Sequence, residues 1–165
     1  MKLVCGKVTI EDVDEFVSIV DKIEKGTGAT IQAFDARYIV NQKHIKRAIE
    51  CADRARRRNN NIARDRSIEM LLYAAGRRQI TEALEIGVSS GLNRIVVAID
   101  GGNEIEAAKS IESNTLDTPA DEVLGSYDPD LVQPYFDITA NEIDVVNGDT
   151  ESLVLERVAL LAVER

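Results

Sequence analysis

The sequence predicts an α+β fold: a single compact domain over residues 1–165, in which a small, mostly antiparallel sheet packs against several helices. Strand-like segments lie near the start of the chain and at residues 94–99, with helical patterns between and after them. The apolar fraction of 44% is typical of a folded chain rather than a disordered one. No internal repeat or linker divides the sequence, so we expect one domain.

The chain begins with a strand and a helix. Residues 2–10 are rich in β-forming side chains and predict a strand. The next segment has apolar residues at helical spacing, at Val13, Phe16, Val17 and Val20. Thr9 with Asp12 resembles a capping box, so we expect the helix to begin there. Glycine at position 26 or 28 should end it.

A second strand and a longer helix follow. Residues 29–35 alternate as a strand does, and Asn41 is a suitable cap for a helix over 42–58. The apolar stripe of this helix is Ile45, Ala48, Ile49, Ala52 and Ala55. Most of its basic residues lie off the stripe, at Lys43, Lys46, Arg47, Arg54, Arg57 and Arg58. We therefore expect the stripe to face the core and the bases to face solvent.

The third helix has more apolar residues than one buried face needs. Three asparagines at 59–61 end the preceding helix, and Asp65 or Ser67 begins this one. Ile68, Leu71, Leu72 and Ala75 share one face, Met70, Tyr73 and Ala74 occupy the rest, and Gly76 ends the helix. Two interpretations stay open: a helix buried on two sides, or one that offers apolar surface to a partner.

The second half of the chain continues the alternation of elements. We expect a short helix over 80–86, a central strand over 94–99, a helix over 103–112, loop with short helical pieces over 113–137, and a short helix over 139–145. Apolar residues of the segment 150–163 have helical spacing, which favours a helix. Its end, residues 157–163, also fits a strand.

A basic segment stands out in this acidic protein, whose formal charge is −9. Residues 37–78 hold twelve Lys or Arg and four Asp or Glu, a net +8, so the remainder is −17. Such separation indicates that the segment contacts a polyanion, and its arginines suit bidentate phosphate contact. Only Tyr38 and Tyr73 are aromatic between residues 35 and 78, which disfavours a broad base-stacking surface. The alternative is a solvated, salt-bridged face.

Several classes of chemistry lack support. His44 is the only histidine and no nucleophile-elbow pattern is present, so we expect no catalytic residue. Cys5 and Cys51 are too few for a zinc site and should be buried packing residues. We expect no cofactor and no metal. No apolar run approaches the ~20 residues of a membrane span and no signal-peptide pattern is seen, so we expect a cytoplasmic protein without membrane contact.

A glycine pair follows the predicted 94–99 strand and precedes a predicted helix. Gly101 and Gly102 lie where a loop could cradle a phosphate. The sequence lacks the spacing of known phosphate-binding loops, and Asp100 and Glu104 make the site electronegative. We expect a simple turn.

The pattern Glu69-x-Leu-Leu-Tyr-Ala-Ala-Gly-x-Arg-Gln-Ile80 resembles the core signature of the TPRKB-like family, the small kinase-binding subunit of the KEOPS/EKC complex. Residues 31–37, the helix with His44, and residues 155–161 agree with the same family. The resemblance therefore covers nearly the whole chain, and its compactness is similar to that of archaeal members.

This resemblance implies a noncatalytic subunit that binds the PRPK-type kinase/ATPase subunit and the tRNA 3′ CCA end, and so supports threonylcarbamoyladenosine modification of tRNA. Kinase contact would fall on Leu71, Leu72, Ile80 and Ala83. Contact with tRNA would fall on Arg64, Arg66, Arg77 and Arg78, to which the charge pattern adds Arg56, Arg57 and Arg58. Two alternatives stay open: a small phospho-ligand-binding enzyme that uses the Gly101–Gly102 loop, and a purely structural adaptor without RNA binding.

Overall fold

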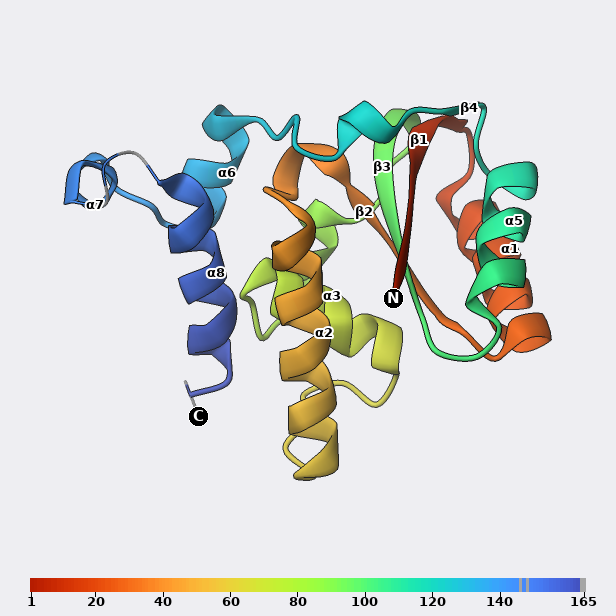
Figure 1. Cartoon of the computed structure of the whole chain (residues 1–165), viewed down its shortest axis with the longest axis horizontal. Coiled ribbons are helices and arrows are strands. Elements are labelled where there is room, and N and C mark those ends of the chain that lie inside the picture. Colours follow the sequence, from red (N-terminus) through yellow and green to blue (C-terminus); the bar gives the residue numbers. More distant parts are fainter. Residues whose placement is uncertain (146, 148, 164–165) are drawn as a thin grey trace.

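A four-stranded antiparallel sheet lies at the centre of the structure, a computed structural model that describes residues 1–145, 147 and 149–163 (Figure 1). The strands are β1 (Lys2–Ile10), β2 (Thr30–Asp35), β3 (Gly91–Asp100) and β4 (Thr118–Pro119). The helices are α1 (Val13–Thr27), α2 (Gln42–Arg57), α3 (Arg66–Ala75), α4 (Ile80–Ala83), α5 (Glu104–Asn114), α6 (Pro129–Tyr135), α7 (Ala140–Val145) and α8 (Thr150–Leu161). Short 3₁₀ turns are η1 (Ala36–Tyr38), η2 (Leu84–Ile86) and η3 (Asp121–Val123). The predicted α+β class with an antiparallel sheet is confirmed.

The strand order is β2-β3-β1-β4, so β3 is central and β2 is an edge strand. Val97 of β3 pairs with Val4 of β1 on one side and with Ala33 of β2 on the other. The run from Ile95 to Ile99 is fully buried, which agrees with the continuous apolar segment in the sequence. Both faces of the sheet are therefore covered.

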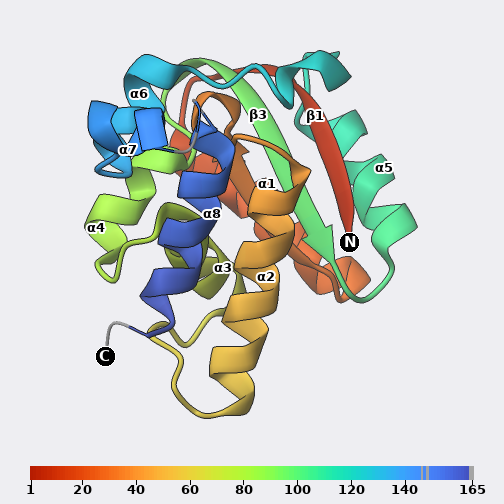
Figure 2. The same cartoon turned by 60° about the vertical axis from the view of Figure 1, so that its left-hand side comes forward.

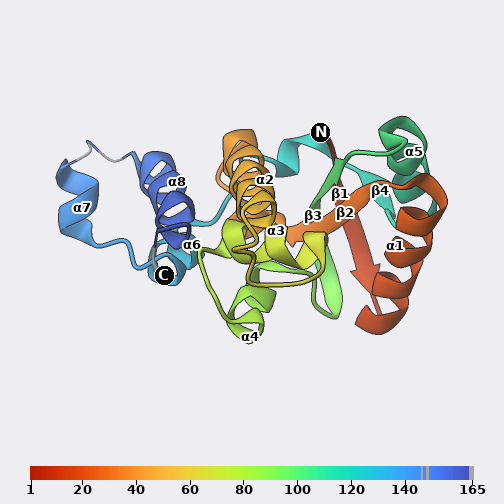
Figure 3. The same cartoon turned by 90° about the horizontal axis from the view of Figure 1, so that it is seen from below.

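Helices cover the two faces in separate layers (Figure 3). On one face, α1 and α5 pack against Ile95, Val97 and Ile99. On the other face, α2, α3, α6 and α8 share a larger core with Val96 and Ala98. Figure 2 shows α8 beside α2, and α8 also contacts α3. Because side chains alternate across a strand, β3 contributes to both cores.

The cap of α1 differs from the sequence-based expectation. The prediction that Thr9 begins the helix is wrong, because Thr9 lies within β1, where it pairs with Leu92. Asp12 is the cap, and its Oδ1 accepts from the amides of Asp14 (2.9 Å) and Glu15 (3.4 Å). The helix ends at Gly28, as expected, in the left-handed conformation at φ 74°.

The structure confirms the amphipathic pattern of α2. Its predicted apolar stripe is buried, and the six basic residues off the stripe are exposed. Asn41 caps the helix by accepting from the amide of His44 (2.9 Å). The buried ring of His44 donates from Nε2 to the carbonyl of Ala74 (2.8 Å) and accepts at Nδ1 from the amide of Val40 (3.3 Å). Burial lowers the pKa of His44 to about 4, so the neutral ring joins α2 to α3.

Helix α3 is buried on both sides. Asp65 caps it, Gly76 ends it, and every side chain from Met70 to Ala75 is at most 1% exposed. It packs against α2, β2 and α8. Residues 70–75 are therefore buried on two sides, as the first of the two interpretations has it, whereas Ile68 near the start of the helix is partly exposed.

The remaining elements follow the expected order. The segment 80–86 forms α4 and η2, and residues 139–145 contain α7. The segment 150–163 is helical through Leu161, so the alternative of a strand is wrong. The short strand β4 was not expected. Both cysteines are buried, as predicted. In the part of the chain that the structure describes, no helix is long and apolar enough to cross a membrane.

Candidate functional site

A buried carboxylate organises the loop between α2 and α3. The side chain of Glu69 is fully buried, and Oε1 accepts from the amides of Ala63 (2.8 Å) and Ile62 (3.0 Å). Its Oε2 also lies 3.0 Å from the amide of Ile62. Arg56 adds a bond from Nη1 to the carbonyl of Arg64 (2.9 Å). The loop is therefore held by contacts to the helices on both sides of it.

Exposed arginines gather on this loop and on the end of α2. Arg57, Arg58 and Arg64 are exposed, and so is Arg54. In Figure 1 the end of α2 and the loop after it extend below the rest of the molecule. We call Arg54, Arg57, Arg58 and Arg64 the α2-end cluster. Its guanidinium groups can reach phosphates without unfolding any element.

Three of the predicted RNA-binding arginines, Arg56, Arg66 and Arg77, make contacts within the protein. Arg66 bonds through Nε and Nη2 to Asp53 (2.8 and 2.9 Å) and through Nη2 to Asp100 (2.6 Å). The bonds to Asp53 and Asp100 raise the pKa of Arg66, although its partial burial opposes this. Arg77 lies over the ring of Tyr135 at 4.7 Å. Arg56 has the loop contact described above, while Arg78 is exposed.

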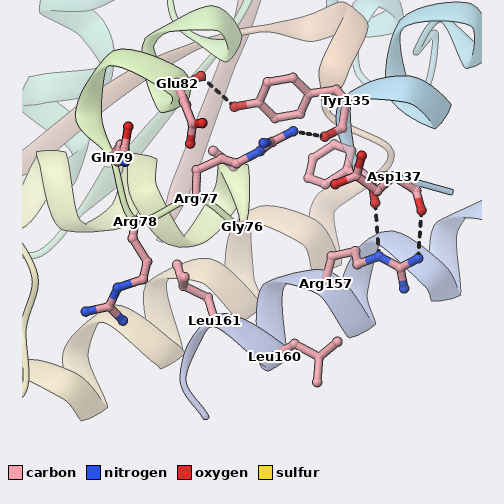
Figure 4. Close-up of a pocket in the computed structure, with 12 residues that line it drawn as sticks. Gly76, Arg77, Arg78, Gln79, Glu82, Tyr135, Asp137, Arg157, Leu160 and Leu161 are labelled. Carbon is pink, nitrogen blue, oxygen red and sulfur yellow. Dashed lines mark hydrogen bonds between the residues drawn. The ribbon is translucent and has the colours of Figure 1, made fainter. Parts of the chain in front are cut away.

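Arg77 and Arg157 line a pocket of about 430 Å³ at the end of α6 (Figure 4). Arg77 donates to the carbonyl of Tyr135, and Arg157 donates to the carbonyls of Phe136 (2.9 Å) and Asp137 (3.1 Å). The carbonyl of Tyr135 is the last of α6, and those of Phe136 and Asp137 follow directly after the helix, where carbonyls lack partners within it. Both arginines therefore act as caps. Figure 4 shows Arg78 pointing away from Tyr135.

An apolar hollow of about 320 Å³ lies beside β2, which we call the β2 groove. It is lined from α1, β2, α3 and η2, with Phe16, Val20 and Leu71 among its apolar residues. At its lips, Val17 is 45% exposed and Leu84 is 53% exposed. Ile80, one helical turn before Leu84, is 46% exposed. Figure 3 shows α4 projecting from the layer that holds α2 and α3.

The four residues predicted to contact a partner differ in accessibility. Ile80 is exposed, whereas Leu71 is only 1% exposed in the wall of the β2 groove. Leu72 and Ala83 are fully buried, so neither side chain reaches the surface. The accessible apolar residues here are Ile80, Leu84 and Val17. Sequence reasoning missed Leu84, although its spacing of four residues from Ile80 was a usable signal.

The Gly101–Gly102 segment is a turn, and the surrounding structure explains why both positions are glycine. The amide of Gly101 donates to Oε2 of Glu104 (2.8 Å), so a carboxylate of the protein occupies that donor. A Cβ on Gly102 would lie 2.3 Å from the backbone carbon of Gly28. Among the residues that the structure describes, no three His, Cys, Asp or Glu side chains lie where they could hold a metal ion.

Comparison with known proteins identifies a protein family whose model matches the residues that form these surfaces. The family model described as "Kinase binding protein CGI-121" matches residues 10–162. No curated protein matches the chain. The matched range includes the β2 groove, Ile80 and the α2-end cluster.

Proposed function

The chain belongs to the CGI-121 family of kinase-binding proteins, and from this premise we propose that it is a noncatalytic subunit that binds the PRPK-type kinase/ATPase subunit of the KEOPS complex. The observation that carries the proposal is the exposure of Val17 and Leu84 at the lips of the β2 groove and of Ile80, one helical turn before Leu84. The subunit would also bind tRNA at its 3′ CCA end and so support threonylcarbamoyladenosine modification.

The kinase-binding surface is centred on α4 and η2. Ile80 and Leu84 are about half exposed, so a partner that covers them removes substantial apolar area from water. Full burial of an exposed side chain of this kind contributes about 1.5–3 kcal/mol, so covering the exposed half of each contributes roughly half of that. Leu71 forms part of the groove wall, and Ala83 is buried within α4.

We expect the double substitution Ile80→Asp and Leu84→Asp to weaken kinase binding about thirtyfold, because two carboxylates would be desolvated in an apolar interface. Isothermal titration calorimetry with the purified kinase subunit measures this. The control is Ile105→Asp on α5, which is 61% exposed and outside the groove. Circular dichroism should show the same melting temperature for the double variant and the control. Unchanged kinase affinity in the folded double variant would contradict the proposed surface.

The proposed RNA-binding surface is the α2-end cluster together with Arg78. The cluster combines exposed arginines with a loop that Glu69 holds in place, which lowers the entropic cost of ordering the loop on binding. Few aromatic side chains accompany it, so phosphate contact rather than base stacking would supply most of the affinity. Arg56, Arg66 and Arg77 would help by holding the surrounding structure.

Reversing two charges in this cluster tests the RNA role. We expect the double substitution Arg57→Glu and Arg58→Glu to weaken tRNA binding about tenfold. The slope of the logarithm of the association constant against the logarithm of the salt concentration should become shallower by about two. The matched control is Lys22→Glu with Lys25→Glu, an equal charge change on exposed residues of α1. Fluorescence anisotropy with tRNA that has or lacks its CCA end measures both variants. Equal tRNA affinity of the two variants would remove Arg57 and Arg58 from the RNA-binding surface, and no binding of either tRNA by the unsubstituted protein would favour the structural adaptor.

A further inference from the structure

Three carboxylates border the β2 groove. Asp21 and Glu24 come from α1, and Asp65 comes from the start of α3. The described residues that line the groove include no lysine and no arginine. The groove is therefore apolar inside and negative at its rim.

Contacts with the backbone hold two of these carboxylates at the rim. Glu24 accepts through Oε2 from the amide of Ile31 (2.8 Å), and Asp65 accepts from the amide of Ser67 (2.8 Å) as the cap of α3. Burial raises the pKa of Glu24, and the charges of Asp65 and Asp21 raise it further, although the bond from Ile31 opposes this. The carboxylates thus repel one another, and a cation placed among them would relieve that repulsion.

The lining of the groove favours a chain segment as its occupant. Its residues come from α1, the edge strand β2, α3 and η2, so an occupant that contacts all of them spans several elements. Val17 and Leu84 extend the apolar surface beyond the groove at its lips. An occupant with apolar side chains alone would take water away from the rim carboxylates and supply no cation to balance their charge, which is unfavourable.

We propose that the β2 groove binds a segment of the kinase subunit in which apolar side chains are flanked by lysine or arginine. The apolar side chains enter the groove, and the cations meet Asp21, Glu24 and Asp65. This inference rests on the kinase binding proposed above. The positive α2-end cluster repels the same segment, so the two surfaces select different partners by the sign of their charge.

The test is the kinase affinity of Asp21→Lys, measured by calorimetry at about 50 mM and about 500 mM salt. Asp21 is exposed, so the substitution should leave the fold intact. We expect an affinity loss of about tenfold at low salt and a clearly smaller loss at high salt. Asp21→Asn should lose about threefold, because it removes attraction without adding repulsion. The control is Glu112→Lys, an equal charge change at an exposed position of α5.

Leu84→Asp separates failure of this inference from failure of the proposed function. If Leu84→Asp weakens kinase binding while Asp21→Lys matches the Glu112→Lys control at both salt concentrations, the basic segment is excluded and kinase binding at the groove stands. If Leu84→Asp also leaves the affinity unchanged, the proposed function fails at this surface. A loss in Asp21→Lys that salt does not reduce would also overturn the charge-based inference.

Discussion

Replacing Glu69 with alanine is expected to lower the free energy of unfolding by about 3 kcal/mol, one of the two largest effects that we anticipate in this protein. The carboxylate is fully buried and accepts from the amides of Ile62 and Ala63. Alanine would leave both amides without this acceptor and would open a cavity in the core. Urea unfolding followed by circular dichroism measures the change.

The loss of Glu69 should also reduce tRNA binding beyond any effect of unfolding, because the loop that it holds carries Arg64. Glu69→Gln retains one acceptor oxygen and should lose about half as much stability. The matched control is Glu112→Ala on α5, an exposed position where we expect a change within about 0.5 kcal/mol. A loss below about 1 kcal/mol for Glu69→Ala would show that the carboxylate does not anchor the loop.

Replacing Gly102 with alanine is expected to destabilise the protein by at least about 3 kcal/mol, or to prevent folding. The added Cβ would lie 2.3 Å from the backbone carbon of Gly28 and 2.5 Å from the nitrogen of Ala29. These are backbone atoms, so no side-chain rotation relieves the clash. The positive φ of 56° adds strain for any residue with a Cβ.

Gly101→Ala is the matched control for the clash. Gly101 also has a positive φ, at 84°, but a Cβ there meets nothing within 4 Å. We expect this variant to lose only about 1–2 kcal/mol, the cost of the left-handed conformation. Thermal melting of both variants separates backbone strain from steric clash. Equal melting temperatures would mean that the Gly102–Gly28 contact rearranges at little cost.

Local patterns predicted most of the secondary structure, and the exceptions have tertiary causes. The periods of apolar residues located α2, α3 and β3, because burial repeats with the geometry of a helix or strand. Thr9 failed as a cap because pairing between β1 and β3 continues to Ile10 and Gly91, which keeps Thr9 in the ladder. A two-residue strand such as β4 has no periodic pattern of its own, and it forms only because β1 provides a partner.

The candidate sites were only partly predictable for the same reason. The positive charge of the basic segment could be predicted from the sequence. The ion-pair partners of Arg66 could not, since Asp53 and Asp100 lie 13 and 34 residues from it in the chain. Arg77 and Arg157 likewise bond to carbonyls that are remote in sequence. Arg57 and Arg58 stayed at the surface because α2 ends beyond the body of the protein.

Sequence patterns alone were enough to predict the α+β class, the order of the elements except β4, the basic face of α2 and the resemblance to a kinase-binding family that the matched family model supports. The tertiary structure decided which residues are accessible. Leu72 and Ile80 both belong to the predicted partner surface, yet Leu72 is fully buried and Ile80 is 46% exposed. Accessibility depends on which elements pack against a helix, and for α3 these include β2 and α8, which no local pattern in its own sequence specifies.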